Sequence, residues 1–439
     1  MNNIVVCKFG GSSLSDAEQF RKVKAIIDGN EERKIVVPSA PGKGKKEKHK
    51  VTDLLLMSHQ LGIHKLNFDE VFNIVKKRFI SIKEGLGLNT DIETELDIIY
   101  ENIKKGAEQA YCASRGEYLN GLLLSDYLGY RFVDATEVIC INEEKPDVET
   151  SCEWIRSKIS VEDKVVVPGY YGVNNEGKIA TFSRGGSDVT GAIMAAGVEA
   201  KLYENWTDVS GFMIADPKVV SEPKPINSLS YKELRELSYM GAPVLHEDAV
   251  FPLKSLRIPI QILNTNCPED RGTLIISDDS FETVGRVITG IAGKKDFTAI
   301  YVEKLFLAEE EGMFRKLVSI FETNKIKIEH MATSIDTISF VVPTQQIEGK
   351  EKKIAEEISI YCGTDNVEFS KGLAVIAVVG RGMVNTKGTS AIIFKALAMA
   401  GINIRMISQG SSELNIVIGV KNEDFEGAIK AIYNQSKEM

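Results

Sequence analysis

The sequence predicts an α/β protein, with a three-layer sandwich around a mostly parallel sheet followed by two small repeated domains. In the first half, short β-branched runs alternate with helical patterns, which is the order of a parallel sheet covered by helices. In the last third, a strand–helix–strand–strand–helix order of about 70 residues occurs twice, a period too long for a solenoid repeat. The length of 439 residues suits roughly three domains of ordinary size.

The first half is expected to hold three buried strands separated by helices. The strands are residues 4–6, 35–37 and 164–167, and the helices are residues 16–27, 53–61, 116–128 and 189–196. Ser15-Asp16-Ala17-Glu18 has the pattern of a capping box, so the first helix should begin there. Residues 63–115 have helical patterns with charged faces and are expected to form an insertion.

The segment 172–178 has the spacing of a Walker A loop, but Ile179 stands where Ser or Thr must bind magnesium. Because Asn174-Asn175-Glu176-Gly177 connects two strand-like runs, we expect a hairpin turn there and no P-loop.

The repeated units determine the expected domain limits. The first copy comprises a helix at 312–324, strands at 325–331 and 337–342, and a helix at 349–361. The second comprises a strand at 373–379, a helix at 389–400, strands at 402–407 and 413–420, and a helix at 422–434. We predict a large domain at 1–282, with 63–115 as its insertion, and small domains at 283–370 and 371–439 that strand exchange can intertwine.

The composition is that of a globular protein and excludes several classes. Lys and Arg total 53 against 62 for Asp and Glu, a net charge of −9, which is the wrong sign for a protein that coats nucleic acid. Neither a secretory signal nor a run of about 18 apolar residues is evident. The six cysteines form no CxxC pair, as expected for free thiols in a reducing compartment. We expect a cytoplasmic protein without a membrane or nucleic-acid partner.

Two glycine loops are candidates for binding anions. Lys8-Phe9-Gly10-Gly11-Ser12-Ser13 follows the first strand, where glycines allow close backbone approach and the next helix offers free N–H groups. The alternative is a plain turn with a solvated lysine. In Ser183-Arg184-Gly185-Gly186-Ser187-Asp188, the arginine offers a fork for a carboxylate, and Asp188 is either functional or simply a helix cap. The polar stretch 207–218 is either a surface loop or part of a site.

The segment Lys43-Gly44-Lys45-Lys46-Glu47-Lys48-His49-Lys50 is strongly basic in an acidic protein. Without interleaved aromatic residues, a nucleic-acid patch is disfavoured, and a solvated mobile loop is the simpler interpretation. A third interpretation is that the loop, which lies beside Thr52 in the sequence, gives positive potential to a site for anionic substrates.

The motifs resemble those of the aspartokinases, within the amino-acid kinase family, nearly from end to end. The repeated C-terminal units resemble tandem ACT domains of βαββαβ topology, and no dehydrogenase half follows them, as in monofunctional members. The matching segments are residues 8–13, 39–42, 51–55, Gly116-Glu117, 168–170, 185–188, Thr207-Asp208-Val209-Ser210-Gly211, 241–246 and 409–416.

The resemblance implies phosphorylation of L-aspartate by ATP with Mg²⁺ at the β-carboxylate, the first step of lysine, threonine and methionine biosynthesis, which includes the diaminopimelate route. No metal held by protein ligands is expected. Lys8 and Asp188 would be catalytic. Aspartate would be bound by Ser39, Thr52, Glu117, Arg184, Gly185, Gly186 and Ser187. Besides Lys8, the nucleotide would be bound by Gly10, Gly11, Ser12, Thr207, Asp208, Met213, Asp216, Lys218, Pro243 and Val244.

Three nucleotide-site residues depart from the commoner family pattern. Met213 stands where a tyrosine often covers the adenine, Lys218 where arginine is frequent, and Pro243 where lysine is frequent. Lys218 keeps the charge without the bidentate fork, and Pro243 offers neither charge nor N–H.

The ACT resemblance implies feedback inhibition by an end-product amino acid, lysine or also threonine, in a homodimer or higher assembly formed through these domains. The effector residues would be Gly312, Met313, Phe314, Glu329, Thr333 and Ser334. Ile335 stands where lysine-sensitive relatives often carry glutamate.

Two alternatives to the aspartokinase function are considered. One is a relative such as glutamate 5-kinase or acetylglutamate kinase, and the other is a catalytically inactive amino-acid sensor on the same fold.

Overall fold

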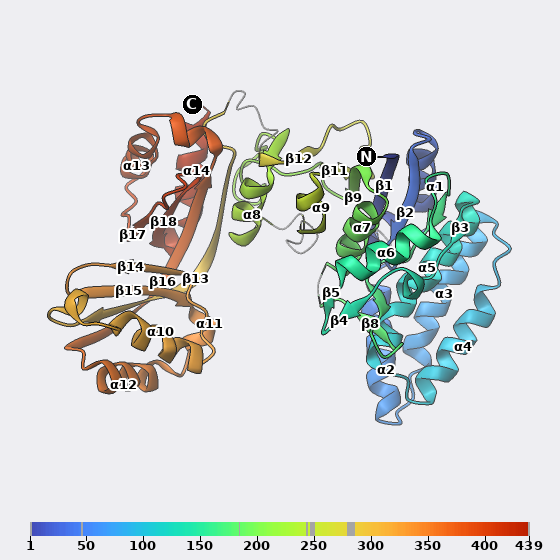
Figure 1. Ribbon diagram of the computed structural model, residues 1–439, viewed down its shortest axis with the longest axis horizontal. Helices are drawn as coiled ribbons and strands as arrows, with labels where there is room; N and C mark the ends of the chain where they lie inside the picture. The colour runs from blue at the N-terminus through green and yellow to red at the C-terminus, as the bar shows by residue number, and fades with distance from the viewer. Residues whose placement is uncertain are drawn as a thin grey trace. The chain divides into compact units, whose positions relative to one another are not determined.

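The computed structural model describes residues 2–44, 47–183, 185–242, 245, 251–278 and 286–437, apart from the side chain of Asn385 (Figure 1). Its contacts divide the chain into two compact units. The first is Met1–Phe212, Pro225–Ser238 and Pro243–Glu282, and the second is Met213–Lys224, Tyr239–Ala242 and Thr283–Met439.

The first unit is built on an eight-stranded sheet. Its strands, in order across the sheet, are β10 (Ser228–Ser230), β12 (Thr273–Ile276), β11 (Ile260–Asn264), β9 (Ala200–Thr207), β1 (Asn2–Phe9), β2 (Arg33–Pro38), β6 (Val165–Val166) and β3 (Arg131–Phe132). All neighbouring pairs are parallel except β11–β12, so the predicted mostly parallel sheet is confirmed.

Helices cover both faces of this sheet, as expected for a three-layer sandwich. They are α1 (Ala17–Asp28), α2 (Val51–Ile63), α3 (Asp69–Leu86), α4 (Ile92–Lys104), α5 (Gln109–Leu128), α6 (Val148–Lys158), α7 (Gly186–Gly197), α8 (Tyr231–Tyr239) and α9 (Phe251–Leu256), with short 3₁₀ turns at Gly11–Leu14 and Ala135–Glu137. Helix α5 packs on β2, β3 and β6, and α7 packs on β1, β2 and β9. Helices α1 to α5 share one core with alternate residues of β1.

Several local predictions for this unit can be compared with the structure. The expected helical insertion contains α3, α4 and the start of α5. Hairpin β7 (Tyr171–Val173) to β8 (Ile179–Thr181) replaces a P-loop as predicted, and a second short hairpin joins β4 (Ile141–Asn142) to β5 (Lys145–Pro146). The cap of α1 is Asp16, which accepts from the Gln19 N–H at 3.0 Å, and not Ser15, whose hydroxyl instead donates to Asp16.

The second unit contains a six-stranded antiparallel sheet. Its order is β14 (His330–Thr333), β15 (Thr337–Pro343), β13 (Gly290–Glu303), β16 (Asn366–Val379), β18 (Asn415–Lys421) and β17 (Met406–Ser408). Its helices are α10 (Met313–Thr323), α11 (Thr344–Ile347), α12 (Glu351–Cys362), α13 (Thr389–Met399) and α14 (Phe425–Ser436), with 3₁₀ turns at Leu307–Glu309, Arg381–Asn385 and Asn422–Asp424.

The two long central strands are shared between both halves of this sheet. Residues 297–303 of β13 pair with β15, whereas residues 290–294 pair with the end of β16, which itself pairs with β18. The register shifts next to Asp296, and Asp296 and Gly372 have left-handed φ values of 70° and 80°. The predicted boundary at 370/371 falls inside β16, and the one at 282/283 lies outside the described residues. The domain limits stay predictions.

Two predicted strands of the second unit are much shorter than expected. The strand predicted at 325–331 begins only at His330, because Lys325 has a left-handed φ of 55° and the Lys327 N–H donates to the Gln346 side chain. The strand predicted at 402–407 begins at Met406. It lies at the edge of the sheet, where β18 is its one partner among the described strands.

The state of the cysteines and the search for a membrane-spanning helix concern the whole of the described chain. All six cysteines are free, as predicted. Within the described residues, no helix is both long and apolar enough to cross a membrane.

At the centre of the first unit, β1 and β9 present a charged network to the core. Glu204 is 3% exposed and its carboxylate accepts from Arg33 Nε at 2.8 Å, Trp206 Nε1 at 2.8 Å and Cys7 Sγ at 3.3 Å. The Arg33 guanidinium also lies 5.3 Å from the Trp206 ring centroid. Burial, followed by the nearby Glu204 charge, raises the pKa of Cys7, which keeps the thiol protonated as a donor.

We predict that Glu204→Leu destabilises the first unit by about 3 kcal/mol, because it leaves the Arg33 charge without its buried partner. The chain's two tryptophans, Trp154 and Trp206, both lie in this unit, so urea unfolding followed by tryptophan fluorescence reports on it. The control is Lys34→Met, which breaks an ion pair to an exposed Glu162 and should cost less than about 1 kcal/mol. Equal losses in the two variants would contradict the prediction.

Candidate active site

The carboxyl ends of β1, β2 and β9 bring three loops together at one edge of the parallel sheet. The Gly10 N–H donates to the Trp206 carbonyl at 2.9 Å, and the Ser39 N–H donates to the Phe9 carbonyl at 3.0 Å. The Gly42 N–H donates to the Gly11 carbonyl at 2.8 Å. A side chain on Gly11 would meet the Ala40 carbonyl at 2.7 Å, so this close approach requires glycine. This edge is where ligands bind in open α/β sheets.

Lys8 lies at this edge in a small network of polar side chains. Its Nζ is 2.6 Å from Asp188 Oδ1 and 3.4 Å from Asn205 Oδ1, while Asn205 Nδ2 donates to Asp188 Oδ1 at 2.8 Å. Lys8 and Asn205 face one another in the β1–β9 register, and Lys8 is 8% exposed. Asn205 is a residue that the sequence analysis missed. Its only signal is its register opposite Lys8, which the sequence alone does not give.

Asp188 takes part in this network instead of capping its helix. It lies in the first turn of α7, whose N-cap is Gly185 with a left-handed φ of 59° and no side-chain cap. A Cβ on Gly169 would lie 2.6 Å from Cβ of Ser187, so the start of α7 packs directly against the chain after β6. The glycine loop therefore directs both Ser187 and Asp188 to the sheet edge.

Glu117 provides a buried carboxylate beside these loops. It lies in α5, is 5% exposed, and its Oε2 has no hydrogen-bond partner among the residues that the structure describes. Burial raises the pKa of Glu117 to about 8, against the lowering effect of a hydrogen bond from the Ala40 backbone. One helical turn along, Asn120 Nδ2 donates to the Ser39 carbonyl at 2.6 Å, which holds the loop after β2. An unpartnered buried carboxylate of this kind suits a cationic group of a ligand.

Two adjoining cavities open among these side chains. The first, of about 450 Å³, is here called the Thr207 cavity, and the second, of about 340 Å³, is called the Asp188 cavity. Both are lined by Gly10, Gly11, Ser39, Lys50, Thr52 and Glu117. Ser12, Thr207 and Asp208 line only the first, whereas Lys8, Tyr170, Gly185, Gly186, Ser187 and Asp188 line only the second. The structure thus gathers most of the predicted catalytic and substrate residues.

The other predicted site residues are not among the described residues of the first unit. Arg184, Pro243 and Val244 lie outside the described residues. Met213, Asp216 and Lys218 belong to the second unit, where Asp216 Oδ1 accepts from the Lys218 N–H at 2.8 Å. Their contact with a nucleotide stays a prediction. Among the residues described, no cluster of three or more His, Cys, Asp or Glu side chains could hold a metal ion.

The predicted effector residues fall into two groups within the second unit. Gly312 caps α10 with a φ of 78°, Met313 and Phe314 begin that helix, and Thr333 and Ser334 end β14 and begin the turn to β15. The Ala308 N–H donates to the Ile335 carbonyl at 3.0 Å, which ties this turn to the loop before α10.

Glu329 lies near the other end of β14, roughly 13 Å from Thr333 at the rise of an extended strand. Its carboxylate is already engaged by the Tyr239 hydroxyl and, at 3.1 Å, by Lys327. The structure therefore does not bring Glu329 to the other predicted effector residues of the same chain.

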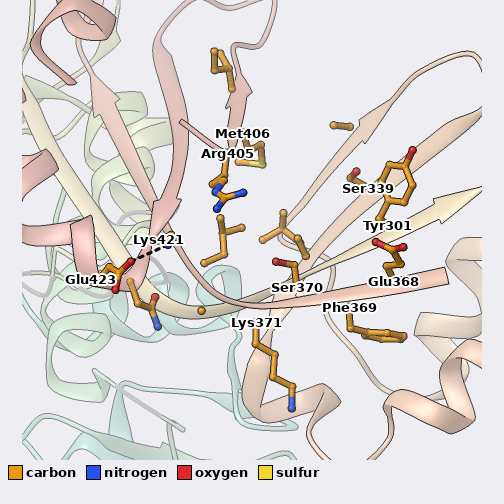
Figure 2. Close-up of a pocket in the computed structure, with 17 residues that line it drawn as sticks. Tyr301, Ser339, Glu368, Phe369, Ser370, Lys371, Arg405, Met406, Lys421 and Glu423 are labelled. Atoms are coloured by element: carbon orange, nitrogen blue, oxygen red, sulfur yellow. Dashed lines mark hydrogen bonds and ion pairs between the residues drawn. The ribbon is translucent and has the colours of Figure 1, made fainter. Parts of the chain in front are cut away.

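A separate cavity of about 670 Å³ lies on the six-stranded sheet of the second unit. Figure 2 shows side chains around it from both halves of the sheet, including Tyr301 of β13 and Arg405 just before β17, and the ion pair between Lys421 and Glu423 at 2.9 Å. None of the predicted effector residues lines this cavity.

Comparisons with known proteins agree with this geometry. The amino acid kinase family matches residues 3–264, more than half of the chain, and an ACT domain matches residues 376–435. Aspartokinase 3 of Bacillus subtilis is 35% identical over 446 residues, covering 98% of both chains. Lysine-sensitive aspartokinase 3 of Escherichia coli is 27% identical and covers 99% of both.

Solved structures give the same result at the level of the fold. The crystal structure of Clostridium acetobutylicum aspartate kinase has a TM-score of 0.93 and 51% identity, covering 98% of this chain and 100% of that one. E. coli aspartokinase III in complex with aspartate and ADP has a TM-score of 0.78 and 25% identity, covering 98% and 99%. The chain therefore belongs to the aspartokinases of the amino-acid kinase family, phosphotransferases that act on a carboxyl group and are regulated through ACT domains.

Proposed function

We propose that the chain transfers the γ-phosphoryl group of ATP to the β-carboxylate of L-aspartate, giving 4-phospho-L-aspartate and ADP. A carboxylate oxygen attacks the γ-phosphorus, the bond from that phosphorus to the β–γ bridging oxygen breaks, and ADP leaves with the bonding electrons. The acceptor is already ionised at neutral pH, so no general base is required. Catalysis then consists of alignment and charge neutralisation.

The observation that carries this proposal is the position of Lys8. It lines the Asp188 cavity, and its Nζ is 3.7 Å from where a Cβ on Gly10 would lie, a residue that lines both cavities. Asp188 and Asn205 fix its ammonium group, which stabilises negative charge on the transferring phosphoryl group. On the Thr207 cavity side, Gly11 and Ser12 donate backbone hydrogen bonds to phosphates, and Gly10, whose N–H is bound to the Trp206 carbonyl, lines the cavity. Thr207 and Asp208 border the nucleotide. Magnesium enters with ATP, held mainly by phosphate oxygens.

Aspartate occupies the Asp188 cavity in this proposal. Glu117 pairs with its ammonium group, Arg184 binds its α-carboxylate, and Ser39, Thr52 and Ser187 hydrogen-bond around it. The solved structure of the E. coli relative is in complex with aspartate and ADP, which supports the same pair of ligands here. The reaction would begin the cytoplasmic synthesis of lysine, threonine and methionine.

The substrate assignment predicts aspartate-dependent ADP release. With MgATP and hydroxylamine as a trap for the acyl phosphate, aspartate should give hydroxamate, whereas glutamate and N-acetylglutamate should give at least about 100-fold less, because the acceptor carboxylate would be displaced by one methylene or an acyl group. A preference for either glutamate compound would support the rival kinases, and no turnover with any acceptor would support a sensor without catalytic activity.

Glu117 gives a second prediction, on pH dependence. Below a pH of about 8 the free enzyme holds Glu117 protonated, so it cannot pair with an ammonium group. The value of kcat/KM for aspartate should therefore rise as pH rises through about 8, until the substrate's own ammonium group deprotonates, while kcat changes little. Glu117→Gln should lose this rise, and its KM for aspartate should exceed that of the wild type about 10-fold only above the Glu117 pKa of about 8, where the wild-type carboxyl is ionised. The control, Glu101→Gln at an exposed position of α4, should keep the wild-type profile.

For regulation, we propose that lysine, with threonine as a second candidate, inhibits the enzyme by binding where α10 begins and β14 ends. The E. coli relative named as lysine-sensitive supports this. The N–H groups of Gly312 and Phe314 suit the effector carboxylate, whereas the Met313 N–H donates to the Glu310 carbonyl at 3.3 Å. The Thr333 and Ser334 hydroxyls suit the effector's other polar groups. Glu329 would contribute its carboxylate only after release from Tyr239 and Lys327.

We also propose that residues 283–370 and 371–439 act as two ACT domains that exchange strands, and that a second copy packs against them in a homodimer. Among the described strands, the edge strands β14 and β17 each pair on one side only, and Met331 and Ile335 are 46% and 71% exposed.

Steady-state assays with lysine and threonine at millimolar concentration test the regulatory site. We predict inhibition that Thr333→Val weakens several-fold, because the variant keeps the shape of the side chain but loses the hydroxyl. Thr323→Val, at the far end of α10, serves as the control and should respond like the wild type. Unchanged rates and substrate affinities with both amino acids would contradict the regulatory proposal.

A further inference from the structure

The basic segment 43–50 borders both active-site cavities. Lys43 lines the Thr207 cavity, and Lys50 lines both cavities. Lys48 lines neither of them, and Lys45 and Lys46 lie outside the described residues. The loop therefore presents two of its charges to the site and directs another elsewhere.

The described part of this loop is held by its own backbone. The Val51 N–H donates to the Pro41 carbonyl at 3.1 Å, which closes the loop at its base, and the Gly44 N–H donates to the Glu47 carbonyl at 3.1 Å. Gly44 also packs so closely that a Cβ would lie 2.8 Å from the Ser15 hydroxyl. These contacts argue against a freely solvated loop.

Arg78 of α3 holds the loop by hydrogen bonds to its backbone and to Glu47. Arg78 is 4% exposed, and its guanidinium donates to the carbonyls of Ser15 at 3.3 Å, Gly42 at 3.0 Å and His49 at 3.3 Å, and to the Glu47 carboxylate at 2.7 Å. Burying a guanidinium is costly unless its donors are used, so these contacts fix both ends of the loop relative to each other. Through Arg78, the helical insertion therefore contacts the loop that borders the active-site cavities.

The charges around the cavities show what the loop adds. Among the described lining residues, Lys8 is already paired with Asp188, and the other carboxylates are Asp53, Glu117 and Asp208. Lys43 and Lys50 form no ion pair within the described part of the chain. They are therefore uncommitted cations beside a site that, by the proposed function, receives a polyphosphate and a dicarboxylate.

We propose that Lys50 binds the transferring phosphoryl group and Lys43 the remaining phosphates of the nucleotide, with Arg78 as the residue that positions both. Lys50 lies where the two cavities adjoin, and so beside the group that passes from one substrate to the other. Lys43 borders only the Thr207 cavity. This inference rests on the proposed function, because it assumes ATP in that cavity.

The test compares Lys50→Met, Lys43→Met and Lys48→Met in the full chain. Lys50→Met should lower kcat about 10-fold or more, since it removes charge that acts in the transition state. Lys43→Met should raise KM for MgATP and the Kd for ADP about fivefold, leave KM for aspartate unchanged, and flatten the salt dependence of ADP binding. Lys48→Met is the matched control and should equal the wild type.

Arg78→Lys tests the positioning role. It keeps the charge but cannot reach four acceptors with a single ammonium group, so it should reproduce both the kcat and the KM defects when assayed well below its unfolding midpoint. A fall in stability with unchanged kcat and KM would show that Arg78 is only structural.

The outcomes separate this inference from the proposed function. If the wild type phosphorylates aspartate and the Lys43 and Lys50 variants match Lys48→Met, the loop inference is wrong while the function holds. If no aspartate is phosphorylated, the proposed function fails, and an unchanged Kd for ADP in Lys43→Met would overturn the role of that lysine as well.

Discussion

The register between β1 and β9 is the constraint on which the first unit depends. Three successive pairs in this register each interact: Cys7 donates to Glu204, Lys8 to Asn205, and Phe9 stacks on Trp206 with ring centroids 6.0 Å apart. Because side chains alternate between the faces of a strand, the first and third pairs point into one helical layer and the middle pair points the other way. A shift of one residue would turn Lys8 into the apolar helical layer and turn Phe9 out of it.

The same register explains how a buried charge network and a reactive lysine occupy neighbouring positions. Glu204 is satisfied by Arg33, Trp206 and Cys7 on the core side, so the strands are held firmly where they carry Lys8. On the opposite face, Asn205 and Asp188 fix the lysine ammonium group. Rigid support of this kind keeps a catalytic group within the narrow geometry that phosphoryl transfer requires.

Burial also determines which charges are committed and which remain available to a ligand. Arg78 is buried with its carbonyl and carboxylate partners, and so acts as a fixed structural element. Burial raises the pKa of Glu117. Within the described residues one oxygen of its carboxyl group is unpartnered, which suits it to a cationic ligand group. In the second unit, Glu329 is committed to Tyr239 and Lys327, so a ligand there must compete with existing contacts.

The sequence by itself determined the α/β class, the parallel sheet, the helical insertion, the hairpin in place of a P-loop, and the two glycine loops as candidates for binding anions. Those features follow from local periodicity and from residues whose backbone chemistry is specific, such as paired glycines. Only the tertiary structure decided that Asn205 faces Lys8, that Arg78 anchors the lysine loop, and that strands expected at 325–331 and 402–407 are short. The physical reason is that register, burial and edge position depend on contacts between residues distant in the chain, which local patterns do not encode.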